Sequence, residues 1–170
     1  MALGSTLIAP DSLGRHTQAV SNMDSAELAE EAFGALARRD FDGFLDLMHP
    51  DVEFTSLIAE SEAKVFCGHA GVRQFIDQML SVFPDFTPEM ERAESHGPVA
   101  LSKVSFQGTG AGSGMEIEQT AWHVAWARDG KVIGWRLYRT EEEARAALSE
   151  VEAAGAEGEP AQQGSPRRRP

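Results

Sequence analysis

The segment "TAWHVAWARDGKVIGWRLYRT", residues 120–140, decides the fold that this sequence predicts. Apolar and aromatic residues fill both halves, and Asp129-Gly130 between them is typical of a tight hairpin turn. We therefore expect two antiparallel strands, near residues 115–128 and 131–139. One histidine, His123, stands among the apolar residues of the first strand. Its imidazole is either a chemical group in a pocket or an ordinary half-buried residue of the sheet.

The composition limits the class of protein. The chain has 170 residues, of which 42% are hydrophobic, and this suits one globular domain. Its net charge of −12 repels phosphate backbones, so nucleic acid is not an expected partner. No apolar run approaches the roughly 18 residues that cross a bilayer, so no membrane association is expected. Cys67 is the only cysteine, and with no signal peptide in view we expect a cytoplasmic location.

The ends of the chain differ from its middle. Residues 1–22 have neither helical nor strand periodicity, and residues 153–170 are rich in Gly, Pro, Ala and Gln. We expect both segments to be disordered, with one domain over residues 23–152. Met23 directly precedes the first strong helix signal, which makes it a candidate for the true start of the protein.

Periodicity within the domain predicts the order of its elements. Apolar residues at helical spacing predict helices over residues 23–40, 40–49, 69–83 and 140–153. Alternating or β-branched segments predict strands over residues 51–58, 86–95, 98–108, 115–128 and 131–139. Two helices come first, one lies between strands, and an antiparallel meander follows. This order predicts an α+β fold in which a curved sheet wraps around helices on its concave face.

Three segments carry a family resemblance: "RDFDGFLDLMHPDVEF" (39–54), "GHAGVRQFI" (68–76) and "GSGMEIEQTAWHVAWARDGKVIGWRLYRTEEEARAAL" (112–148). In this order and spacing they resemble the SnoaL-like branch of the nuclear transport factor 2-like superfamily, over about residues 24–150. The resemblance implies a cone-shaped α+β barrel, open at one end, with a pocket between sheet and helices. Such barrels include isomerases, polyketide cyclases, epoxide hydrolases, dehydratases and non-catalytic binding modules, so the fold alone does not identify a function.

Ketosteroid isomerase, an enzyme of this superfamily, uses an aspartate base with a tyrosine and a protonated aspartic acid as oxyanion donors. In the resemblance its tyrosine falls on Ala32, its base on Thr55 and its second aspartate on Gln119. None of the three carries the required group, so that steroid chemistry is not supported. The Asp-Arg-Asp arrangement of the epoxide hydrolases also finds no counterpart.

Alternation of side chains along strands, combined with the resemblance, predicts which residues face the pocket. The expected set is Glu53, Thr55, Gln119, Ala121, His123, Trp135 and Leu137. Of these only His123 and Glu53 titrate, and if chemistry occurs we expect His123 to transfer the proton while Glu53 orients it or shares the proton. The alternative is that the His123 imidazole is hydrogen-bonded inside the barrel and only shapes the cavity.

The opposite face of the hairpin is apolar too. It carries Trp122, Val124 and Trp126, with Arg136 and Tyr138 on the matching face of the partner strand. Two such faces from two copies would bury each other, so we expect a homodimer. If the alternation is reversed, Arg136 and Tyr138 become the polar groups of the pocket instead.

Two classes of function remain open. The first is a binding module for an apolar small molecule, with an unknown ligand and possible loss of catalysis. The second is a cofactor-independent isomerase, cyclase or dehydratase that uses proton transfer by His123. No metal is expected, because metal-binding spacings of histidine or cysteine are missing, and no cofactor is expected. The glycine-rich residues 108–114 precede a strand and are expected to form a hairpin loop.

Overall fold

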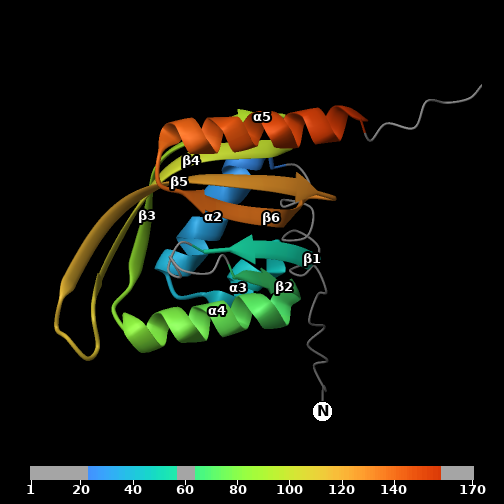
Figure 1. Cartoon of the computed structure of the whole chain (residues 1–170). Helices are drawn as coiled ribbons and strands as arrows, with labels where there is room; N and C mark the ends of the chain where they lie inside the picture. The colour runs from blue at the N-terminus through green and yellow to red at the C-terminus, as the bar shows by residue number, and fades with distance from the viewer. Residues whose placement is uncertain (1–22, 57–63, 158–170) are drawn as a thin grey trace, which may run out of the picture.

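The computed structural model describes residues 23–56 and 64–157 of the chain. The elements follow one another in the order that Figure 1 shows: α2 (Ser25–Ala37), α3 (Phe41–Asp46), β1 (Met48–Thr55), β2 (Val65–Cys67), α4 (Gly68–Val82), β3 (Thr87–His96), β4 (Val99–Thr109), β5 (Glu116–Arg128), β6 (Lys131–Tyr138) and α5 (Glu141–Glu157).

The strands form one six-stranded sheet in the order β2-β1-β6-β5-β4-β3. β1 and β6 run parallel, and the other neighbouring pairs are antiparallel. The sheet curves around α2, and α4 lies across its lower edge in Figure 1. The α+β class with a curved sheet around N-terminal helices, predicted from the sequence, is thus confirmed.

The predicted hairpin of residues 120–140 is present as β5 and β6. Its turn residues, Asp129 (φ 53°) and Gly130 (φ 72°), both have positive φ, the conformation that an Asp-Gly turn accommodates. The register pairs His123 with Leu137 and Ala125 with Trp135. These residues therefore lie on one face of the sheet, as the alternation predicted.

Polar contacts fix the start of α2 against the sheet. Asp24 caps the helix by accepting a hydrogen bond from the Glu27 backbone N–H at 2.9 Å, and the Glu27 carboxylate accepts one from the Asp24 N–H at 3.0 Å. The Ser25 hydroxyl donates to the Val99 carbonyl oxygen at 2.9 Å. Because Val99 opens β4, this bond ties the first turn of α2 to the sheet that it crosses.

The main core fills the inside of the cone. Trp135 of β6, 1% exposed, lies at its centre, with ring centroids 4.8 Å from Phe33, 5.6 Å from Phe44 and 5.3 Å from Phe54. These rings come from α2, α3 and β1. Aromatic contact thus joins both N-terminal helices to the two parallel strands.

A second, smaller core lies on the outer face of the sheet. Helix α5 covers this face (Figure 1) and packs its Ala144 and Leu148 against Val99, Leu101 and Val124. The partly buried Trp122, Trp126, Tyr138 and Val151 complete this outer cluster. Helix α5 of the same chain therefore accounts for the apolar residues of the outer face. From the sequence, we expected a second copy of the chain to cover this face.

The structure departs from the predicted elements in three places. Met48 and His49, expected at the end of a helix, begin strand β1. The segment 59–68, expected as a turn, contains the short strand β2, whose three residues are too few to show periodicity. Helix α5 continues to Glu157, so the predicted domain boundary at residue 152 falls inside it. The predicted disorder of residues 1–22 and 158–170 lies outside the described residues.

Candidate functional site

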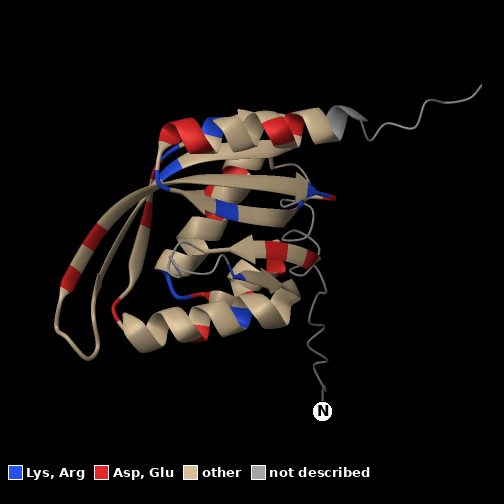
Figure 2. Cartoon of the chain, in the orientation of Figure 1, with Lys and Arg blue, Asp and Glu red and all other residues tan. Residues whose placement is uncertain are grey.

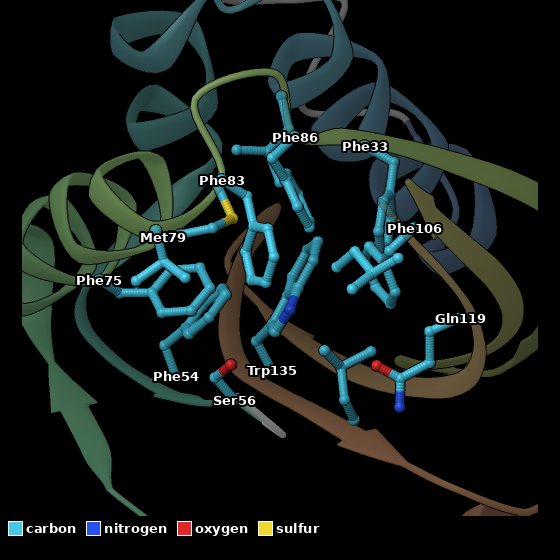
Figure 3. A pocket seen from close by; sticks show the side chains of 14 residues that line it. Phe33, Phe54, Ser56, Phe75, Met79, Phe83, Phe86, Phe106, Gln119 and Trp135 are labelled. Carbon is cyan, nitrogen blue, oxygen red and sulfur yellow. The ribbon is translucent and has the colours of Figure 1, made fainter. Parts of the chain in front are cut away.

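A cavity of about 550 Å³ lies between the concave face of the sheet and helices α2 and α4 (Figure 3). Both helices, four strands and the loop after α4 contribute to its wall. The lining residues are Phe33, Leu36, Phe54, Ser56, Phe75, Met79, Val82, Phe83, Phe86, Phe106, Ile117, Gln119, Trp135 and Leu137. A cavity of this size is typical of a small-molecule site.

The wall of this cavity is almost entirely apolar. Seven of its side chains are aromatic, and none is charged. The rings of Phe54 and Phe75 lie 4.6 Å apart, and those of Phe86 and Phe106 stack at 5.4 Å. Offset and edge contacts of this kind leave flat apolar surfaces exposed to the cavity. The arrangement suits a flat, apolar ligand.

Ser56 and Gln119 are the polar residues of the lining, and Trp135 adds one indole N–H group. Gln119 is exposed to solvent, so it lies at the opening of the cavity. In Figure 3 its amide stands apart from the group of aromatic rings. An amide both donates and accepts hydrogen bonds, and it can therefore orient a ligand's polar end without selecting a charge.

The loop after α4 is held over the cavity by a carboxylate. Asp85 accepts hydrogen bonds from the Thr109 backbone N–H at 2.6 Å and from the Thr109 hydroxyl at 2.7 Å. These two hydrogen bonds lower the pKa of the Asp85 carboxyl. Because Phe83 and Phe86 flank Asp85 and line the cavity, this contact fixes part of the wall to the end of β4.

His123 lies behind the cavity wall and is fully buried (0% exposed). Its ring centroid is 4.0 Å from that of Trp135 and 5.0 Å from that of Phe33, and both of these rings line the cavity. Burial lowers the pKa of His123 to about 3, so its imidazole is neutral at pH 7. Neither ring nitrogen has a hydrogen-bond partner in the described part of the chain. The hydrogen-bonded imidazole considered from the sequence is therefore not found there.

Glu53 and Thr55 do not face the cavity, and the expected orientation of β1 is wrong. Along this strand Val52 and Phe54 are buried, whereas Glu53 is exposed. Burial of the apolar side chains decides the face, because a carboxylate loses its hydration inside the cone. Figure 2 shows acidic residues along β1. Glu53 thus lies on the opposite side of the sheet from His123.

The other predicted residues lie on the concave face. Gln119, Trp135 and Leu137 line the cavity, whereas Ala121, 1% exposed, belongs to the core. The reversed alternation is not found, since Tyr138 packs in the outer cluster and Arg136 lies over the Trp126 ring at 5.1 Å. The role of each residue in binding stays a prediction.

Sequence reasoning missed much of the lining. Phe75 and Met79 of α4 line the cavity but were not among the predicted pocket residues. Ser56 was missed because β1 was expected to present its opposite face. Phe83 and Phe86 stand in the loop around Pro84, where no periodicity indicates a direction. The signal that could have indicated their partial burial is the presence of two phenylalanines beside the proline that ends α4.

Residues 23–56 and 64–157 contain neither a membrane-crossing helix nor a cluster of metal-binding side chains. No helix there is long and apolar enough to cross a membrane. In the same ranges, no group of three or more His, Cys, Asp or Glu side chains is placed to hold a metal ion.

Comparison with known proteins identifies the domain and its fold. Residues 29–135 match the family model of the SnoaL-like domain. No curated protein sequence matches the chain. An NTF2-like protein from Burkholderia thailandensis is similar in structure, with a TM-score of 0.64 at 16% identity over 74% of this chain and 98% of that chain.

Two similar structures contain small molecules. TerC co-crystallized with polyporic acid has a TM-score of 0.59 at 21% identity, covering 73% of this chain and 94% of that chain. RV0760c from Mycobacterium tuberculosis, in complex with estradiol-17beta-hemisuccinate, has a TM-score of 0.59 at 16% identity, covering 71% of this chain and 97% of that chain. At these identities the likeness shows the fold, and the family model over residues 29–135 confirms the predicted SnoaL-like resemblance.

Proposed function

The chain belongs to the SnoaL-like domain family, and from this premise we propose that it binds an apolar, aromatic small molecule in the cavity between the sheet and helices α2 and α4. The lining of that cavity is the observation that carries the proposal: seven aromatic side chains, no charged one, and two polar ones. Burial of a ligand's apolar surface against these rings supplies the favourable free energy of binding.

The placement of the polar groups supports an oriented ligand. Gln119 lies at the opening, so a polar group of the ligand that stays near solvent would hydrogen-bond its amide. The small molecules bound by TerC and by RV0760c are consistent with this use of the fold. They support the class of function and do not name the ligand of this chain.

The second candidate is a cofactor-independent isomerase, cyclase or dehydratase with His123 as its proton-transfer group. A buried, neutral imidazole without a hydrogen-bond partner in the described residues favours it. Two observations weigh against it. The low pKa of about 3 makes the imidazole a poor base, and Glu53 on the outer face cannot share the proton. Binding is therefore the function that we prefer.

The experiment compares two bulky substitutions on neighbouring residues of β5. Gln119 lines the cavity opening, whereas Thr120 is exposed on the other face of the strand. We expect Gln119→Trp to weaken binding of 2-methylnaphthalene at least about tenfold, or ~1.4 kcal/mol, as measured by calorimetry. Thr120→Trp is the matched control and should bind as the wild type does.

Native mass spectrometry of freshly purified protein adds a direct search for the natural ligand. A co-purified apolar molecule that the Gln119→Trp variant lacks would support the proposal. Equal binding of 2-methylnaphthalene by both tryptophan variants would contradict it, because the cavity would then not be the binding site.

A further inference from the structure

Two buried polar side chains face each other across β4 and β5. Ser102 and His123 are direct partners in the antiparallel register, and they are 1% and 0% exposed. Neither the Ser102 hydroxyl nor either His123 nitrogen has a hydrogen-bond partner in residues 23–56 and 64–157. Buried polar atoms nearly always have partners, so this pair needs a specific explanation.

Both side chains belong to the concave face. Side chains alternate between the two faces along β4. Val104, two residues after Ser102, lies in the main core, whereas Leu101, directly before Ser102, lies in the outer cluster. His123 contacts Phe33 of α2 and Trp135 of β6, which lie inside the cone. The Ser102–His123 pair therefore sits under α2, at the inner end of the site.

The chemistry of the pair suits one small oxygen group. Direct partners in an antiparallel pair have Cβ atoms about 4.5–5.5 Å apart, so a single oxygen atom can lie within reach of both side chains. A hydroxyl is one donor and an acceptor, and a neutral imidazole offers one donor and one acceptor. Together they can bind either a hydroxyl or a carbonyl oxygen.

The cavity wall is thin at this point. Phe33 and Trp135 line the cavity on one side and contact His123 on the other, and their ring centroids are 4.8 Å apart. Figure 3 shows both rings on the wall of the cavity. A shift of these two side chains, without any change of the backbone, would connect the cavity with the polar pair.

We propose that Ser102 and His123 form the inner polar end of the ligand site and together bind one hydroxyl or carbonyl oxygen of the ligand, which passes between Phe33 and Trp135. The inference rests on the proposed function, because the apolar body of the same ligand occupies the aromatic cavity. The ligand then supplies the hydrogen bonds that the described part of the chain does not make. Apolar residues of similar size would fill the same positions without the free-energy cost of burying polar atoms that have no hydrogen-bond partner.

The test uses two probes of equal shape, 2-naphthol and 2-methylnaphthalene, which differ by a hydroxyl in place of a methyl group. In the double variant Ser102→Ala/His123→Phe, we expect the affinity for 2-naphthol relative to that for 2-methylnaphthalene to fall about tenfold below its wild-type value. The reason is that two hydrogen bonds to the hydroxyl are lost. Ser102→Ala alone removes only a hydroxyl and should give part of this change. Ser105→Ala, on the other face of β4, is the matched control and should leave the ratio unchanged.

Thermal unfolding without ligand supplies a second readout. Removing an unpartnered buried polar group should raise the Tm, so both Ser102→Ala and His123→Phe are expected to unfold at a higher temperature than wild type. A purely structural role predicts the reverse. A lower Tm with an unchanged affinity ratio would mean that the pair holds a structural water, and would overturn the inference.

The outcomes separate the two proposals. If wild type binds both probes and no variant changes the ratio, the inference fails while the proposed function stands. If Ser56→Ala changes the ratio and Ser102→Ala does not, the hydroxyl binds near β1 and the inference is wrong. If wild type binds neither probe, the proposed function fails, and the inference fails with it.

Discussion

The indole ring of Trp126 lies directly over the backbone of Gly134 on the neighbouring strand. The two residues are partners in the β5–β6 register, and a Cβ atom added to Gly134 would overlap the six-membered part of the indole. Trp126 belongs to the outer cluster under α5. A glycine at position 134 thus allows a large aromatic ring to cover the sheet where α5 docks.

Gly134→Ala should destabilise the protein for this reason. The added methyl group displaces the indole, and overpacking of this kind costs about 1–3 kcal/mol. The free energy of unfolding, measured by urea denaturation, checks the expectation. Gly112→Ala is the matched control, because nothing lies within 4 Å of a Cβ atom at that position. Equal stability of the two variants would contradict the packing described for Trp126.

The buried imidazole predicts a dependence of stability on pH. Burial lowers the pKa of His123 from 6.5 to about 3, so between these values the unfolded chain binds a proton that the folded protein does not. The free energy of unfolding therefore falls as pH falls through this window, by at most about 1.4 kcal/mol per pH unit. The pKa values of Asp24 and Asp85 are also lowered, from 3.8. Protonation of these carboxyls therefore also reduces the free energy of unfolding as pH falls, but only near the acidic end of the window.

Urea denaturation at several pH values inside that window measures the slope. His123→Phe should remove most of it, because the phenyl ring binds no proton. A variant with the wild-type slope would show that other groups cause the pH dependence, and that His123 is not buried in its neutral form.

The contact between Asp85 and Thr109 predicts how the cavity wall is held. Asp85→Ala removes both hydrogen bonds to Thr109, so the loop with Phe83 and Phe86 should open more often. Hydrogen exchange of the amides in residues 83–86 and 108–111 should become faster. Asp77→Ala, an exposed change on α4, serves as the control and should leave these rates unaltered.

The homodimer predicted from the sequence can be tested through α5. Leu148, 5% exposed, packs this helix on Val124 and its neighbours, and Leu148→Glu would place a carboxylate there. If copies associate through the outer face, weakening α5 should increase the dimer fraction measured by light scattering. Glu150→Gln, exposed on the same helix, is the control. A monomeric mass for the wild type and both variants would contradict the predicted dimer.

The sequence predicted the fold better than the site, because the two depend on different information. The hairpin around Asp129-Gly130 has local signals, alternation and a turn that requires positive φ, and its register followed directly. The resemblance supplied the remaining order of elements. The coverage of the outer face by α5 had no comparable signal, since its few apolar residues among many charges fit a solvated helix equally well.

The site shows the same difference. Gln119, Trp135 and Leu137 line the cavity because they follow the alternation of the hairpin. Glu53 was misplaced because the face of β1 was taken from the resemblance, although the apolar Val52 and Phe54 indicate the opposite face. Within the described residues His123 has no hydrogen-bond partner, which depends on what packs around it in three dimensions, and no local pattern encodes that.

The parallel pairing of β1 with β6 has a consequence for how the protein is made. Phe54 and Trp135 are register partners and stack in the cavity wall, yet synthesis from the N-terminus produces them far apart in time. Contacts so distant along the chain slow folding, and the cavity cannot close until β6 has left the ribosome. We expect pulse-labelling during refolding to show β1 amides gaining protection together with those of β6. Protection of β1 well before β6 would indicate that this strand first finds another partner.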